Sequence, residues 1–196
     1  MKNISVTTTT SILALLSALT LNPVGAATGT PGSYEIDPAH TSVSFSVNHL
    51  GISTLVGRFN SVEGDISLAP KGDSAIEVSI ETASVDTNHE KRDEHLRGPD
   101  FFNVKQYPVM KFTASSINFS GEKSERIKGK LSLHGKTKPV MLTVEPIGAG
   151  DDPWGGYRAG YKATTVIKRS EFGMDFMPGG IGDDISVTLN IEAIKQ

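Results

Sequence analysis

Strict alternation of apolar and polar side chains is the feature of this chain that most restricts its fold. From Val43 to His49 the odd positions carry valine, phenylalanine and histidine, whereas the even positions carry serine and asparagine. The same alternation returns near the other end of the chain, from Ile185 to Ala193. A period of two residues is typical of β-strands with one buried face and does not match the 3.6-residue period of a helix.

The alternation predicts eight strands, joined mostly by short segments rich in glycine, proline, aspartate and lysine that are typical of hairpins. The second strand changes phase near Asn60 and Ser61, which predicts a bulge there. Consecutive hairpins favour an up-and-down meander, and eight strands can close into a barrel. The predicted strands span residues 41–49, 55–69, 75–84, 109–120, 125–134, 138–148, 156–168 and 184–194.

One internal segment breaks the alternation. Residues 88–97 are dense in charge and helix-forming side chains, and Gly98 and Pro99 follow them as a stop signal. We therefore expect an all-β fold, an eight-stranded antiparallel barrel with a short helical segment between strands 3 and 4. This segment is expected to cover one end of the barrel.

The N-terminus has the pattern of a secretory signal peptide. Lys2 precedes an apolar run at residues 12–21, and small residues follow at positions 24–27. A membrane anchor would need about 20 apolar residues, so the run is too short for stable membrane insertion. We expect cleavage after Ala26, which leaves residues 27–196 as a single exported domain.

Composition excludes several classes of function. The chain has 196 residues and a net charge of −3, which argues against nucleic-acid binding. It has no cysteine, so disulfides, thiolate metal sites and a cysteine nucleophile are excluded. The Gly-x-Ser-x-Gly motif of hydrolases does not occur. His40 and His49 are nine positions apart, and an odd separation places them on opposite faces of a regular strand, which argues against a shared metal site. We therefore predict neither a metal site nor a catalytic set of residues.

The interior of the barrel has two possible uses. Eight strands leave room either for a core of side chains or for one small ligand. The apolar positions include Gly57, Gly64 and Gly129. These glycines either relieve crowding at bends or leave space for a guest, and the pattern alone favours neither.

Several segments together resemble the YceI-like family of polyisoprenoid-binding proteins. They include residues 34–45 (Tyr-Glu-Ile-Asp-Pro-Ala-His-Thr-Ser-Val-Ser-Phe), 92–97 (Arg-Asp-Glu-His-Leu-Arg), 129–135 (Gly-Lys-Leu-Ser-Leu-His-Gly) and 169–173 (Arg-Ser-Glu-Phe-Gly). The resemblance implies a lipocalin-like barrel with an elongated apolar channel for an isoprenoid lipid, such as a polyprenyl phosphate or a quinone tail. It also implies a periplasmic location and a homodimer. We predict no cofactor.

We therefore predict a non-catalytic lipid-binding or carrier protein with two groups of ligand-binding residues. His49, Arg58 and Arg92 are expected at the mouth, where they would contact a headgroup. The residues expected along the lipid tail are Phe45, Val47, Phe59, Phe101, Phe102, Met110, Phe112, Leu131 and Phe172.

Two alternatives stay open at this point. The chain could be a hydrolase-type enzyme acting on an apolar substrate, with His49 or His95 as its base. It could instead be a stress-responsive interaction module whose cavity is incidental.

Overall fold

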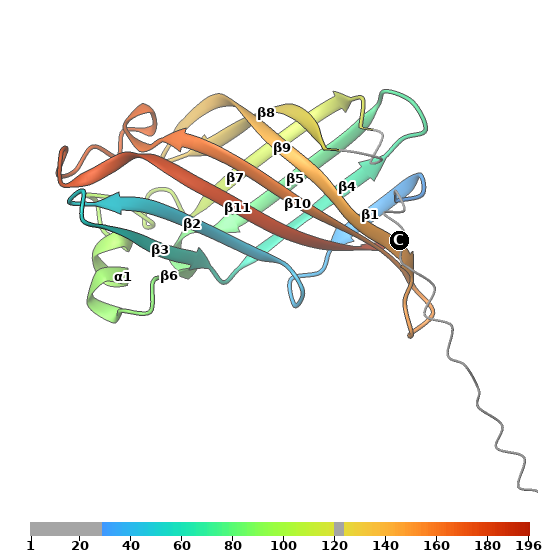
Figure 1. Ribbon diagram of the computed structural model, residues 1–196, viewed down its shortest axis with the longest axis horizontal. Coiled ribbons are helices and arrows are strands. Elements are labelled where there is room, and N and C mark those ends of the chain that lie inside the picture. The colour runs from blue at the N-terminus through green and yellow to red at the C-terminus, as the bar shows by residue number, and fades with distance from the viewer. Residues whose placement is uncertain (1–28, 120–123) are drawn as a thin grey trace, which may run out of the picture.

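The computed structural model describes residues 29–119 and 124–196, which form one closed β-sheet with a short helix (Figure 1). The predicted signal peptide lies outside the described residues and stays a prediction. Within the described ranges, no helix is long and apolar enough to span a bilayer. The strands are β1 (Gly32–Ile36), β2 (Ser42–His49), β3 (Ser53–Phe59), β4 (Val62–Leu68), β5 (Ser74–Glu81), β6 (Val85–Asp86), β7 (Val109–Ile117), β8 (Glu125–Leu133), β9 (Lys136–Asp151), β10 (Tyr157–Lys168) and β11 (Ile181–Lys195).

The sheet is the predicted eight-stranded antiparallel barrel. Its order is β1-β4-β5-β7-β8-β9-β10-β11, and pairing of β1 with β11 closes the ring. β2 also pairs with β11, so β1 and β2 together line one edge of β11. β4 pairs with β1 and β3 pairs with β2, so β3 and β4 together form the next strand position of the barrel. The eight predicted strands are thus present, and the second of them is interrupted.

The interruption in the second predicted strand falls where its phase changes. β3 ends at Phe59 and β4 begins at Val62, so the predicted bulge at Asn60 and Ser61 is a break between two strands. The backbone N–H groups of both residues bond to Ser84, which lies in a 3₁₀ turn (η1, Thr82–Ser84). β1 was not predicted, because its five residues are too few to show a clear alternation.

The helix α1 (Glu90–Arg97) occupies the predicted segment. The side chain of His89 caps its first turn by accepting a hydrogen bond from the Arg92 backbone N–H, and Gly98 ends the helix. Polar bonds fix its position, since Arg97 donates to the carbonyl oxygens of Ala83 and Val85 at 2.8 and 2.9 Å. The helix therefore stays at the end of the barrel that carries the β2–β3 hairpin (Figure 1).

The opposite end, where β1 meets the end of β11, is tied together by Arg158 of β10. Its Nη1 atom lies 2.6 Å from both Asp37 and Glu192, and its Nε atom lies 2.9 Å from Asp152. The hydrogen bond from Arg158, followed by that from His40, lowers the pKa of Asp37 to about 2. Although Asp37, His40 and Glu192 are close enough together to resemble a metal site, the guanidinium already supplies the positive charge.

Candidate functional site

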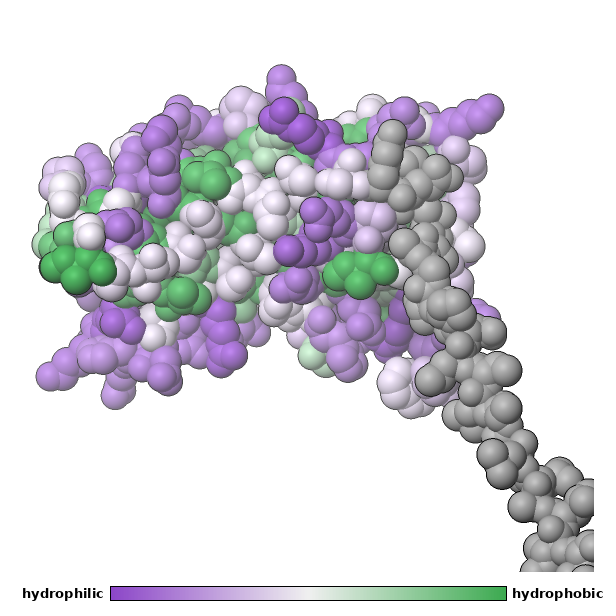
Figure 2. All heavy atoms as spheres, in the orientation of Figure 1, coloured by the Kyte–Doolittle hydropathy of each residue, from purple (hydrophilic) through white to green (hydrophobic). Residues whose placement is uncertain are grey.

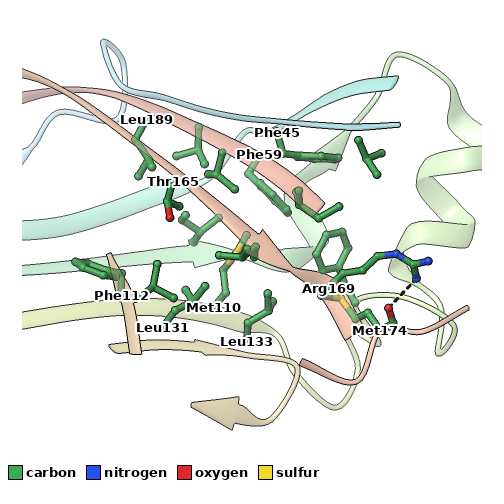
Figure 3. Close-up of a pocket in the computed structure, with 18 of the residues that line it drawn as sticks. Phe45, Phe59, Met110, Phe112, Leu131, Leu133, Thr165, Arg169, Met174 and Leu189 are labelled. Carbon is green, nitrogen blue, oxygen red and sulfur yellow. Dashed lines mark hydrogen bonds between the residues drawn. The ribbon is translucent and has the colours of Figure 1, made fainter. Parts of the chain in front are cut away.

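The barrel encloses an apolar cavity of about 830 Å³, within the range of roughly 300–1,000 Å³ that is usual for ligand pockets. Figure 3 shows Phe45, Met110, Phe112, Leu131 and Leu189 directed into a common space from different strands. Alternate residues of each strand face the same side of the sheet, so the apolar residues of the alternating pattern all point inward. The predicted apolar cavity is therefore present.

One end of the cavity opens to the surface. Three large apolar side chains that line it are also exposed, namely Val56 (62%), Phe176 (37%) and Met177 (44%). Leu50 and Ile52, at the tip of the β2–β3 hairpin, are exposed beside them, and the Leu50 backbone N–H bonds to Gly180 of the β10–β11 loop at 2.7 Å. Figure 2 shows hydrophobic residues at this end of the molecule. We call this opening the mouth.

The other end of the cavity is closed. Its deepest lining residues include Phe119, Tyr161 and Ile191, all less than 10% exposed. Beyond them Tyr34 and Ala159, each 1% exposed, belong to the same core but do not line the cavity. The predicted channel is thus a blind pocket that stops short of the barrel's far end, because aromatic and aliphatic side chains fill that end.

Most of the predicted ligand-binding residues meet in this cavity. Two do not: Arg58 is turned outward and bonds Asp86 at 3.0 Å, and Phe172 is buried but lies outside the lining. Those that line it are Phe45, Val47, His49, Phe59, Arg92, Phe101, Phe102, Met110, Phe112 and Leu131. Their contact with a ligand stays a prediction.

The two predicted arginines differ because of their positions on strand and helix. Arg58 lies on the outward-facing side of β3. Hydrogen bonds from the backbone N–H of Asn88, and then from the side chains of Asn60 and Arg58, lower the pKa of Asp86 to about 2. Arg92 lies on α1 and lines the mouth, but its Nε and Nη2 atoms donate to Thr87 at 2.7 and 2.6 Å. Arg92 therefore also anchors the helix.

Arg169 is a residue of the mouth that the sequence analysis missed. It is 5% exposed, and it donates to the carbonyl oxygens of Met174, Ile181 and Gly182 at 2.7–3.0 Å (Figure 3). These bonds hold the β10–β11 loop that carries Phe176 and Met177. Arg169 continues the inward phase of Thr165 and Ile167 on β10, so the alternation itself was the signal that could have identified it.

The glycines have a different purpose from leaving room for a guest. A Cβ atom on Gly57 would collide with the ring of Phe45, and one on Gly129 would collide with the ring of Phe112. Gly64 has φ +154°, and a Cβ there would strike the carbonyl oxygen of Glu77. Of the two alternatives left open for these glycines, the structure therefore favours relief of crowding, because the protein's own rings and backbone occupy the space.

We expect Gly129→Ala to destabilise the fold by about 1–3 kcal/mol, because the added methyl would overpack the wall. It would meet the Phe112 ring and also the Thr113 carbonyl oxygen at 2.7 Å, and backbone cannot move aside. Urea unfolding measures the change. Gly150→Ala on β9 is the matched control, since its Cβ would meet nothing within 4 Å. Equal losses in both variants would contradict the packing argument.

A closed antiparallel barrel with an apolar pocket open at one end is a ligand-binding type of β-barrel. The chain belongs to the YceI-like family, since the YceI-like domain matches residues 34–193. A UPF0312 protein of Shewanella denitrificans is 42% identical over 189 residues, covering 94% of this chain and 97% of that protein.

Two solved structures share the fold. The crystal structure of a Campylobacter jejuni YceI protein is 29% identical with a TM-score of 0.65, covering 76% of this chain and 90% of that one. A polyisoprenoid binding domain from Saccharophagus degradans has a TM-score of 0.66 at 16% identity, covering 83% and 98%. At 16% identity, that second likeness speaks for the fold alone.

Proposed function

We propose that this chain is a non-catalytic periplasmic binding or carrier protein that holds a long isoprenoid lipid in its cavity. The observation that carries the proposal is the one-ended apolar pocket with an exposed apolar mouth. The cavity volume of about 830 Å³ has room for roughly 28 groups the size of a water molecule, if each takes about 30 Å³. A chain of several isoprene units has this size, and the polyisoprenoid binding domain with the same fold supports this class of ligand.

Hydrocarbon burial supplies ample free energy for binding. Each buried CH₂ contributes about 0.8 kcal/mol, so one five-carbon isoprene unit offers roughly 3–4 kcal/mol before costs. Several units would exceed the affinities that proteins reach, so the ordering of the chain must offset much of this gain. Apolar contacts carry little direction, and we therefore expect the wall to accept chemically different prenyl tails.

Headgroup selectivity has to come from polar groups at the mouth. His49, Arg92 and His95 line the cavity there, and His95 lies 2.9 Å from Asp100. Imidazole and guanidinium N–H groups donate hydrogen bonds to phosphate or quinone oxygens. This set suits a polyprenyl phosphate or a quinone-like headgroup that stays at the surface while its tail is buried.

Native mass spectrometry of gently purified protein, followed by lipid extraction, tests this function. We expect co-purifying isoprenoid lipids whose headgroups identify the ligand. The polypeptide mass is expected to lack residues 1–26, and the same spectrum reads whether the protein forms a homodimer. Repeated recovery of an empty protein that takes up no added prenyl lipid would overturn the proposal.

A further inference from the structure

We propose that Phe119 and Tyr161 set an upper limit to the length of the lipid tail that the cavity accepts. This inference rests on the proposed function. Each further isoprene unit gains free energy when it is buried, so an apolar wall does not by itself reject longer chains. Rejection needs a steric stop, and the two rings lie where such a stop has to be, at the closed end.

The two rings pack against each other across the cavity floor. Their centroids are 5.5 Å apart with an interplanar angle of 61°, an edge-to-face arrangement that holds both rings in place. Phe119 follows β7 and Tyr161 belongs to β10, so the floor joins opposite parts of the barrel. Both side chains line the cavity and both are less than 10% exposed.

The region beneath the floor is already filled. Ala159 comes two residues before Tyr161 on β10 and pairs with Ala193, which is 0% exposed. Tyr34 lies in the same core, with its hydroxyl donating to the Thr30 carbonyl oxygen at 2.6 Å. A tail that reaches the rings cannot extend further unless it displaces close-packed side chains, which protein interiors resist.

The inward residues of strand β10 lie at successive depths in the cavity. Ile167, Thr165 and Ala163 line the cavity from the mouth towards Tyr161, at intervals of about 6.5–7 Å because alternate residues face inward. Ala163 is small and lies next above the floor, where it pairs with Leu189 and Val144. A larger side chain at position 163 would therefore raise the floor without altering the mouth.

The test uses the purified protein and a ladder of polyprenols that differ by one isoprene unit, with occupancy compared by native mass spectrometry. Wild-type protein is expected to show a length above which binding falls sharply. Phe119→Ala removes a six-carbon ring, so we expect the limit to rise by about one five-carbon unit. Ala163→Leu is expected to lower the limit. Phe45→Ala removes the same ring higher in the cavity, where it should weaken binding at every length but leave the limit in place.

The outcomes separate this inference from the function on which it rests. Opposite shifts in Phe119→Ala and Ala163→Leu, with an unmoved limit in Phe45→Ala, would support the floor as the stop. Polyprenol binding with the same limit in all variants would overturn the inference alone. If wild-type protein bound no polyprenol of any length, the proposed function would fail and the length limit with it. Should Phe119→Ala fail to fold, Ala163→Leu decides the question, since it adds atoms next to open space.

Discussion

Val187→Glu is expected to abolish binding of prenyl lipids while the barrel still folds. Val187 lines the cavity on β11, where it pairs with Phe45 on one side and Thr165 on the other. A bound tail would shut water away from the new carboxylate. Burying an unpaired charge costs several kcal/mol, and each 1.4 kcal/mol or so is a factor of about ten, so we expect at least a roughly 100-fold loss of affinity.

Ser186→Glu is the matched control, because it adds the same charge one residue away on the exposed face of β11. Polyprenol binding and thermal unfolding are measured for both variants. We expect the control to bind as the wild-type protein does. Acidification should partly restore binding to Val187→Glu, because burial raises the pKa of a carboxyl group and favours its neutral form. Equal loss of binding in both variants would show that the tail does not lie inside the barrel.

Arg158→Met is expected to lower the melting temperature by several degrees at neutral pH. The substitution leaves Asp37, Asp152 and Glu192 without the guanidinium that they share. Two of these carboxylates are nearly buried, with side chains 11% and 7% exposed for Asp37 and Asp152. Uncompensated carboxylates at close range repel each other and lose solvation. Arg126→Met, on the exposed surface of β8, is the control for the loss of one positive charge.

The pH dependence of this effect follows from the lowered pKa of Asp37. That pKa is about 2 in the folded protein, against an ordinary value of 3.8 for aspartate, chiefly because Arg158 donates to the carboxylate. A carboxyl group whose pKa is lowered in the folded protein stabilises the fold at pH values above its unfolded-state pKa. This contribution disappears as the pH falls through its folded-state pKa. Thermal melts from pH 7 to pH 2 should therefore show the two proteins converging below about pH 4. A constant difference across this range would contradict the role given to Arg158.

Local patterns predicted much of the fold and part of the site. The alternation at residues 41–49 and 184–194 identified β2 and β11 and their inward faces, and the phase change at Asn60 and Ser61 located the break between β3 and β4. Helix-forming side chains and the stop signal at Gly98 and Pro99 identified α1. The alternation also placed Phe45, Val47 and Leu131 on the cavity wall. These successes share one cause, since strand and helix periods are properties of neighbouring residues.

The errors arose where distant segments meet. Gly129 lies under Phe112 only because β7 and β8 pair in one particular register, so sequence alone could not tell a ring-filled site from an empty one. Arg58 and Arg92 looked equivalent as headgroup ligands. The outward phase of β3 turned Arg58 towards Asp86, whereas the position of α1 brought Arg92 to the mouth.

The sequence by itself determined the strands other than β1 and β6, their buried faces, the short helix and the family, because each depends on local periodicity or on short motifs. Only the tertiary structure decided how deep the cavity runs and where it opens. Phe119, Tyr161 and Tyr34 come from segments far apart in the chain, and strand register and closure of the barrel bring them to its closed end. The depth of the pocket is therefore a property of the closed sheet and cannot be read from any one strand.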